Sequence, residues 1–282
     1  PMIAVKVENS DLAYPLAGLE RADVIYEEPV EGGITRFAAL YQCAAPTRVG
    51  PVRSARTTDP KILAPYADEP VLAYSGANPT VASIVEQAGI ISLTETTANA
   101  AYERDDARSA PHDLFVSVQA LYPIAAEQGA DDERPRSVFR YDEEVPTPNR
   151  PRTGATVTFS TSTVVGWSWT DGRWQRLLDG APMTAESGAP IAVDNVVIQQ
   201  VRVTESDIVD VAGFASPEVR LVGGGRAWIL RDGSLIVGRW RRASLDEATI
   251  FETKAGDEVA LAPGTTFVQL IPRDGGDVAF TR

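Results

Sequence analysis

Short apolar runs follow one another closely in the first half of the chain. The runs MIAVKVEN, ADVIYEE, TRFAALYQC, VLAYSG and GIISLTE are rich in β-branched and aromatic residues. Runs of this kind, bounded by Gly, Pro or Asn, are typical of strands. Between the last two runs, Asn78 and Pro79 precede the apolar spacing of VASIVEQA, and Gly89 follows it. This arrangement predicts a helix with a cap at each end.

A second helix and a linker are predicted further along the first half. The helix starts at Ser117 and continues through VQALYPIAAEQ, with a kink or break at Pro123, because proline removes one helix hydrogen bond. Residues 129–154 are dense in charge and also contain several prolines, namely Pro135, Pro146, Pro148 and Pro151. That composition is typical of a linker, here with one short strand. We therefore place a domain boundary between residues 145 and 146.

The second half has a β pattern throughout. The pairs Asp171-Gly172 and Asp232-Gly233 each separate two alternating apolar runs, and Asp-Gly favours the tight turn of a hairpin. The runs NVVIQQVRV, DEVALA and TFVQLIP add further strands. The sequence thus predicts an α+β protein with an N-terminal mixed α/β domain over residues 1–145. A C-terminal, mainly antiparallel β domain follows over residues 146–282.

All five tryptophans of the chain lie in the second half. We interpret most of them as filling the core between sheets. Trp240 is the best candidate for an exposed ring, because Arg239, Arg241 and Arg242 flank it. Exposed tryptophans would form a face that stacks on sugars or peptides.

The composition limits the kinds of partner. Hydrophobic residues make up 44% of the chain, enough to build a core, and the net charge is -13. Nucleic acid is not an expected partner, because sequence-independent binding needs many Lys and Arg to neutralise phosphates. No apolar run reaches the roughly 18 residues of a membrane helix. Since a strand-like run begins immediately after Pro1, we expect a segment with targeting information to precede it.

The stretches EEPVEGGITRF and RVGPVRSART combine glycines with charged residues. Pro51 suits the first position of a helix, which would place Arg53 and Arg56 on one helix face. Amide groups at a helix start and two guanidinium groups suit a phosphate, sulfate or carboxylate. We predict that Arg36 joins Arg53 and Arg56 in one partly exposed anion-binding pocket.

The same stretches allow a second interpretation. Gly32 and Gly33 would let the backbone approach a bound anion closely. Alternatively, the arginines pair with Glu27, Glu28 and Glu31 and only fasten two loops together, because internal ion pairs imitate functional clusters. The sequence leaves both interpretations open.

His112, the only histidine, lies in the run SAPHDLF. Next to Asp113 it is a candidate general base, although a loop residue that bonds to the backbone fits equally well. Glu31 is the other candidate for proton transfer. Arg108, upstream of His112, completes the predicted ligand-binding residues.

Cofactors and metals are not expected. One Cys and one His cannot build the Cys/His clusters of zinc sites, and a hard ion would need Asp23, Glu28 or Glu31. Cys43 ends the strand-like run TRFAALYQC and is interpreted as a small core residue. The sequence therefore predicts neither a cysteine hydrolase nor a transition-metal enzyme.

The motifs EGGITRF, GPVRSAR and APHDLF, with the run GRAW…DG…GRW…LAPGTTFVQLIP, resemble the YerB-like lipoprotein family. This family is a two-part bacterial domain of unknown function, and the resemblance covers nearly the whole chain. It implies a lipid anchor on the outer face of the cytoplasmic membrane. The anchoring cysteine would lie upstream of Pro1, because Cys43 does not match it. The resemblance implies no catalytic residues.

Three functions remain open at this point. We expect an extracytoplasmic envelope protein that binds an anionic small molecule, a lipid head group or a cell-wall glycan, or a protein partner in the envelope, and supports cell-wall processes. The first alternative is an envelope enzyme for a phosphorylated or glycan substrate, in which Arg53 and Arg56 stabilise charge and Glu31 or His112 moves protons. The second alternative is an interaction module whose Trp-rich half docks another protein.

Overall fold

A large mixed sheet extends through the computed structural model, which describes residues 1–145, 149–210 and 213–282. Its strand order is β18 (Ile250–Thr253), β17 (Ser234–Arg242), β16 (Gly223–Arg231), β14 (Asn195–Val209), β19 (Thr266–Pro272), β2 (Val24–Pro29), β3 (Thr35–Tyr41), β1 (Ile3–Asn9), β4 (Val71–Ala73) and β5 (Ile91–Leu93). Two further strands extend it, since β15 (Ala215–Arg220) pairs with β14 and β8 (Arg150–Pro151) pairs with β17.

Strand β19 connects the two halves of the chain. It lies parallel to β14 on one side and to β2 on the other, so that Val268 pairs with both Val197 and Tyr26. The strands of both halves therefore form one continuous sheet. The domain boundary between residues 145 and 146 stays a prediction, and residues 146–148 of the predicted linker lie outside the described residues.

The second half also has an antiparallel sheet of its own. This sheet contains, in order, β12 (Ala181–Pro182), β11 (Arg173–Leu178), β10 (Val164–Thr170), β9 (Gly154–Thr158) and β20 (Asp277–Thr281), and β13 (Ala192–Val193) pairs with β11. A small separate ladder joins β6 (Tyr102–Arg104) to β7 (Leu114–Val116). The predicted α+β class, with a mixed first part and a mainly antiparallel second part, is confirmed.

Both Asp-Gly pairs form hairpin turns, as predicted. Asp171 and Gly172 have φ values of 51° and 76°, and Asp232 and Gly233 have values of 49° and 65°. Two positive φ angles in a two-residue turn match the twist of the flanking strands. The first turn joins β10 to β11 and the second joins β16 to β17, so the two hairpins belong to different sheets.

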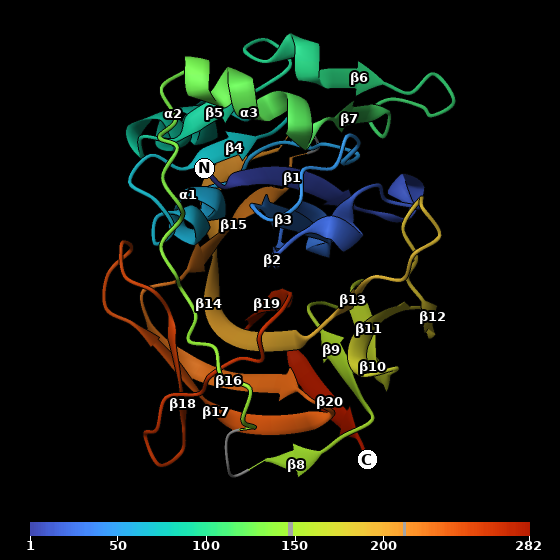
Figure 1. Ribbon diagram of the computed structural model, residues 1–282, viewed down its shortest axis with the longest axis vertical. Coiled ribbons are helices and arrows are strands. Elements are labelled where there is room, and N and C mark those ends of the chain that lie inside the picture. Colours follow the sequence, from blue (N-terminus) through green and yellow to red (C-terminus); the bar gives the residue numbers. More distant parts are fainter. Residues whose placement is uncertain (146–148, 211–212) are drawn as a thin grey trace.

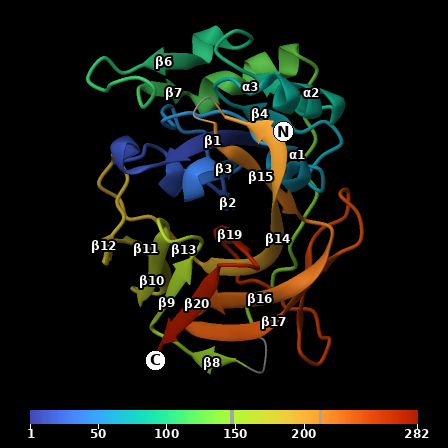
Figure 2. The ribbon, with the colours of Figure 1, turned by 180° about the vertical axis from the view of Figure 1, so that it is seen from behind.

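Within the described residues the helices are short, and all of them lie in the first half. They are α1 (Thr58–Leu63), α2 (Pro79–Gln87) and α3 (Val118–Glu127), with the 3-10 turns η1 (Asp11–Ala13), η2 (Leu19–Arg21), η3 (Glu31–Gly33) and η4 (Asn99–Ala101). Figures 1 and 2 show α2 and α3 at the end of the molecule that holds β4 and β5, opposite β16 and β17.

The predicted start of α2 is confirmed, because the Asn78 side chain accepts a hydrogen bond from the Thr80 amide at 2.9 Å. Ser117 caps α3 in the same way through the Ala120 amide. Helix α3 continues through Pro123 to Glu127, so the break expected there is absent.

The helix predicted at Pro51 does not form. Val49 and Val52 instead make bridges with Val116 and Val7, and the first helix starts only at Thr58. The segment is held as extended chain between β1 and β7, because its backbone completes hydrogen bonds at the edges of both strands. Arg53 and Arg56 consequently share no helix face.

Each face of the large sheet packs against a buried apolar cluster. Along β1, Ile3, Val5 and Val7 pack into one apolar cluster, while Ala4 packs into a second cluster on the opposite face. Trp240 belongs to the second cluster with only 3% of its surface exposed, and its indole donates to the Gln200 carbonyl at 2.8 Å. The prediction of an exposed Trp240 is therefore wrong, because its ring lies over Gly225 on β16 and packs into this cluster with Phe251 of β18.

Candidate functional site

Arg36 is a buried cation without a partner. It lies on β3, directly opposite Glu8 on β1 and Glu28 on β2, so the three side chains project from one face of the sheet. Arg36 is 8% exposed, and its guanidinium makes no hydrogen bond or ion pair with any described residue. Burial, together with the nearby charges of Arg56 and Arg53, lowers the pKa of Arg36 to about 10, although Glu31 and Glu8 act in the opposite direction.

Arg56 and Glu31 form a tight pair beside Arg36. Nε and Nη2 of Arg56 donate to Oε2 of Glu31 at 2.9 and 2.6 Å, and the Ser216 hydroxyl of β15 donates to Oε1 at 2.5 Å. Burial acts to raise the pKa of Glu31, but the Arg56 charge and these hydrogen bonds outweigh it, so the pKa falls below its ordinary value. Glu31 is therefore an ionised acceptor and not a proton donor at neutral pH. This contact is the loop-fastening arrangement that the sequence left open.

Glu8 is the carboxylate that contacts His112. Nδ1 of His112 lies 2.9 Å from Oε2 of Glu8, and Nε of Arg53 lies 3.7 Å from the same oxygen. Nη1 of Arg53 donates to the Pro111 carbonyl at 2.9 Å. Asp113, the partner predicted for His112, accepts instead from Arg104 at 3.0 Å, so that prediction is wrong. The Asp113 carboxylate therefore lies against Arg104 of β6 and does not contact His112.

We use the name arginine cluster for Arg36, Arg53, Arg56, Glu8, Glu31 and His112. The charges of Glu8, Glu31, Arg53 and Arg56 all act on Arg36, which places these groups around one guanidinium. Three guanidinium groups face two carboxylates, so the cluster has an excess of positive charge. Its free hydrogen-bond donors include the Arg36 guanidinium and Nε of Arg53. This combination suits an anion with several acceptor oxygens.

Arg108 and Gly33 have other roles. Arg108 donates to the Ala13 and Pro15 carbonyls, both at 2.8 Å, and so fastens the loop after β1. The Gly33 carbonyl accepts from the hydroxyls of Ser160 and Thr163 in the second half.

Of the two glycines in the predicted site, Gly32 is the one that borders open space. No heavy atom lies within 4 Å of where a Cβ at Gly32 would sit, whereas Ser162 lies 3.0 Å from the equivalent position at Gly33. Gly32 also has a φ of 73°, which favours glycine.

The remaining acidic candidates bind separate partners. Glu27 pairs with Arg176, Glu28 pairs with Lys6, and Asp23 accepts the amides of residues 42 and 43. Within the described residues, no group of His, Cys, Asp and Glu is arranged to hold a metal ion.

Cys43 is exposed, contrary to the prediction that it packs in the core. Strand β3 ends at Tyr41, so Cys43 follows the strand and lies in a bend. The thiol donates a hydrogen bond to the Asp23 carboxylate, and this bond, the negative charge of Asp23 and partial burial raise the pKa of the Cys43 thiol.

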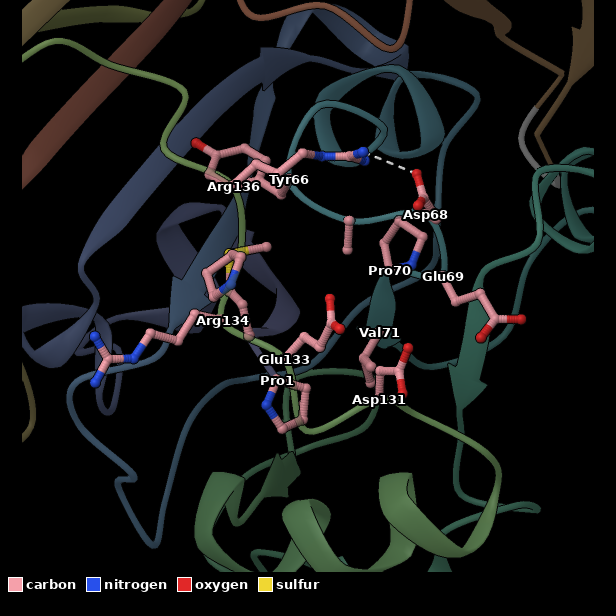
Figure 3. A pocket seen from close by; sticks show the side chains of 13 residues that line it. Pro1, Tyr66, Asp68, Glu69, Pro70, Val71, Asp131, Glu133, Arg134 and Arg136 are labelled. Carbon is pink, nitrogen blue, oxygen red and sulfur yellow. Dashed lines mark hydrogen bonds and ion pairs between the residues drawn. The ribbon is translucent and has the colours of Figure 1, made fainter.

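Two neighbouring cavities lie elsewhere, one bordered by the first half alone and the other also by Pro263, Gly264 and Thr265 of the second half. The cavity in Figure 3 has a volume of about 370 Å³ and is bordered by Asp68, Glu69, Asp131, Glu133, Arg134 and Arg136. Arg136 donates to Asp68 at 2.9 Å, and the acidic side chains outnumber the arginines, so this cavity is a poorer candidate for binding an anion than the arginine cluster. A larger and mostly apolar cavity of about 640 Å³ adjoins it beside Phe139 and Tyr141. Neither cavity is lined by Arg36, Arg53 or Arg56, and a pocket over these arginines stays a prediction.

Among the helices of the described residues, none has the length and apolar character needed to cross a membrane.

Comparisons with known proteins identify relatives along nearly the whole chain. The N-terminal domain described as "Protein of unknown function (DUF3048)" matches residues 1–131, and the corresponding C-terminal domain matches residues 155–268. The chain is similar to "Putative lipoprotein YerB" of Bacillus subtilis (strain 168), with 25% identity over 277 residues, covering 96% of this chain and 81% of that protein. The crystal structure of the YerB protein from Bacillus subtilis matches with a TM-score of 0.82 at 24% identity, covering 99% of this chain and 93% of that one. At this identity the structural likeness concerns the fold alone.

Proposed function

The chain belongs to the DUF3048 family, and from that premise we propose that it is an extracytoplasmic protein of the lipoprotein type whose arginine cluster binds an anionic ligand. The name of the Bacillus subtilis relative supports the location, since a lipoprotein is held at the membrane surface by its lipid. All three motifs contribute to the cluster. EGGITRF contains Glu31 and Arg36, GPVRSAR contains Arg53 and Arg56, and APHDLF contains His112.

The observation that supports this proposal most strongly is the unpartnered guanidinium of Arg36. A buried charge is normally paired and hydrogen-bonded, because leaving water without compensation is unfavourable. The lowering of its pKa from 12.5 to about 10 corresponds to roughly 3 kcal/mol against the charged form. A bound anion would supply both the opposite charge and the missing acceptors.

The strength of the available hydrogen bonds, compared with the cost of association, indicates the size of the ligand. Hydrogen bonds to charged groups contribute about 1.5–3 kcal/mol each, while association costs an estimated 4–15 kcal/mol. Arg56 is already occupied by Glu31, so a bare phosphate would meet few free donors. We therefore propose a larger anionic ligand, a lipid head group or a cell-wall glycan, with further contacts beside the cluster.

A second candidate function is favoured by one contact. The 2.9 Å distance between His112 and Glu8 has the geometry of a general base oriented by a carboxylate. An envelope enzyme that acts on a phosphorylated or glycan substrate would use Arg36 to stabilise charge and His112 to move a proton. The tryptophan-face alternative has lost its main support, because the ring of Trp240 is buried.

The proposal is tested by thermal unfolding with sodium phosphate or pyrophosphate against sodium chloride at equal ionic strength. We expect pyrophosphate to raise the melting temperature of the wild type and to leave that of Arg36→Met unchanged. Arg140→Met is the matched control, because it removes one positive charge from an exposed side chain. An equal response of wild type and Arg36→Met would refute the site.

A further inference from the structure

A second group of cations lies where the β14–β15 hairpin passes α1. Arg202 on β14 is directly opposite Arg220 on β15, and the next pair on the same face is Thr204 with Glu218. Figures 1 and 2 both show β15 beside α1, the helix that contributes Lys61.

Among the described residues, no acid forms an ion pair with either arginine. Glu218 is occupied by Lys61 and by the Thr57 hydroxyl. Arg220 donates through Nε to the Val222 carbonyl at 3.1 Å, and the side chain of Arg202 makes no hydrogen bond or ion pair with the described part of the chain. Like charges directly opposite each other on paired strands are destabilising. In a chain with a net charge of -13, this is a local surplus of positive charge.

The cations border a cavity with an apolar wall. Its volume is about 360 Å³, and its charged lining residues are Lys61, Arg202, Glu218 and Arg220, with Leu221, Val222 and Leu245 among the apolar ones. Leu245 is 41% exposed, so part of its apolar surface is open to water. With Glu218 paired to Lys61, the cavity offers two unpaired arginines and apolar surface.

We propose that this cavity binds an amphiphilic phosphate, with the phosphate between Arg202 and Arg220 and a short apolar chain against Leu245. Two guanidinium groups match the charge of a phosphate monoester, about −1.5 to −2 at neutral pH, and Arg forks suit its oxygens. The apolar chain gains by covering leucine surface that is exposed to water in the free protein. The volume is sufficient for a small ligand. This site shares no residue with the arginine cluster and does not depend on the function proposed for it.

The chain contains a matched control pair. Arg226 on β16 is directly opposite Arg239 on β17, so these arginines repeat the like-charge arrangement. However, Arg226 lies over the Trp228 ring at 5.1 Å, and Arg239 has Glu252 opposite it on β18. Neither residue lines the cavity beside Leu245.

The test is calorimetric titration of the whole chain at constant ionic strength with three probes. These are octyl phosphate and octyl glucoside, each below its critical micelle concentration, and inorganic phosphate. We expect octyl phosphate to bind at one equivalent per chain, inorganic phosphate to bind at least tenfold more weakly, and octyl glucoside not to bind. The double variant Arg202→Gln/Arg220→Gln should weaken octyl phosphate binding at least tenfold, whereas Arg226→Gln/Arg239→Gln should change it less than twofold.

Several results would overturn the proposal. Equal binding of octyl glucoside would show a purely apolar cavity, and equal binding of inorganic phosphate would show that the apolar wall contributes nothing. Unchanged affinity in Arg202→Gln/Arg220→Gln would place the phosphate elsewhere. Arg36→Met separates the two proposed sites, because it should leave octyl phosphate binding intact. A melting temperature for each variant at or above that of the wild type would confirm that it is folded.

Discussion

Glu8 and Arg36 lie directly opposite each other on β1 and β3, yet their side chains form no ion pair or hydrogen bond. Glu8 instead contacts His112 at 2.9 Å and has Arg53 within 3.7 Å. Glu28, the acid opposite Arg36 on β2, is paired with Lys6. Arg36 consequently keeps its charge in a buried position while both cross-strand acids contact other groups. In the free protein this arrangement is unfavourable, and a bound anion would make it favourable.

The first prediction follows from this unpaired buried charge. In buffer without multivalent anions, Arg36→Met should raise the free energy of unfolding by about 1–3 kcal/mol, because it removes an uncompensated buried charge and keeps an apolar stem. Urea denaturation of wild type, Arg36→Met and Arg36→Lys measures this. The lysine variant retains the charge and should not be stabilised. A loss of more than about 1 kcal/mol in Arg36→Met would mean that Arg36 supports the fold instead of a ligand.

The second prediction concerns Asp59, which shares the fully buried Lys6 with Glu28. Burial, together with the charge of Glu28, raises the pKa of Asp59 from 3.8 to about 6, although Lys6 acts in the opposite direction. The folded protein therefore holds this proton more tightly than the unfolded chain does. From about pH 4 to about pH 6 the free energy of unfolding should fall as pH rises, and Asp59 should add no further change above pH 6.

Asp59→Asn should remove that slope and increase stability at pH 7 by up to roughly 3 kcal/mol. An asparagine oxygen can still accept the Arg56 amide that Asp59 now accepts at 2.6 Å. Urea midpoints between pH 4 and pH 7 measure the slope, with Asp106→Asn as an exposed control. If the wild type and Asp59→Asn show the same pH dependence, Asp59 does not titrate in this range.

Features encoded within a few residues were predicted from the sequence. The Asp171-Gly172 and Asp232-Gly233 turns and the Asn78 cap depend on chemistry inside one short segment, so no knowledge of the fold was needed. The extended chain at Pro51 and the buried Trp240 depend instead on strands far away in the sequence. At Pro51 the local sequence favoured a helix, but pairing with β1 and β7 keeps the chain extended. At Trp240 the flanking arginines favoured an exposed ring, but packing with residues of β16 and β18 buries it.

The candidate site could be predicted only in part for the same reason. Arg36, Arg56 and Glu31 were found because they lie in short motifs crowded with charge and glycine. Glu8 and Ser216 were missed. Glu8 belongs to the cluster because the pairing of β1 with β3 places it opposite Arg36. Ser216 contacts Glu31, 185 residues away in the sequence, only because β15 of the second half packs against the first half.

The third prediction concerns the buried pair of Glu27 and Arg176. Both residues are inaccessible to water, and Arg176 donates to the two carboxylate oxygens at 2.8 and 2.9 Å. Arg176→Met leaves the Glu27 charge buried without its main partner and should lower the free energy of unfolding by about 3–5 kcal/mol. The double variant Glu27→Gln/Arg176→Met should recover most of that loss, because it buries no charge.

Urea denaturation of the three proteins measures both effects. Arg173→Met is the control, since Arg173 and its partner Asp194 are partly exposed and should contribute less than about 1 kcal/mol. A double variant as unstable as Arg176→Met would show that packing, and not the charge of Glu27, explains the loss.

The last prediction is that Cys43 reacts slowly although it is exposed. The thiolate is the reactive form of cysteine, so a raised pKa reduces the reactive fraction at neutral pH. The hydrogen bond and the negative charge of Asp23 raise the pKa of Cys43 in the folded protein. Unfolding removes Asp23 from the thiol, so iodoacetamide at pH 7.5 should label the folded protein more slowly than the same protein in urea. Asp23→Asn should label faster than the wild type when folded, because the neutral amide no longer opposes the thiolate.

Cys43 also lines the 640 Å³ cavity, so restricted access is the competing explanation for slow labelling. The pH dependence separates the two, because a raised pKa moves the midpoint of the labelling profile to higher pH, whereas restricted access lowers the rate at every pH. A folded-state profile with an unshifted midpoint would refute the influence of Asp23.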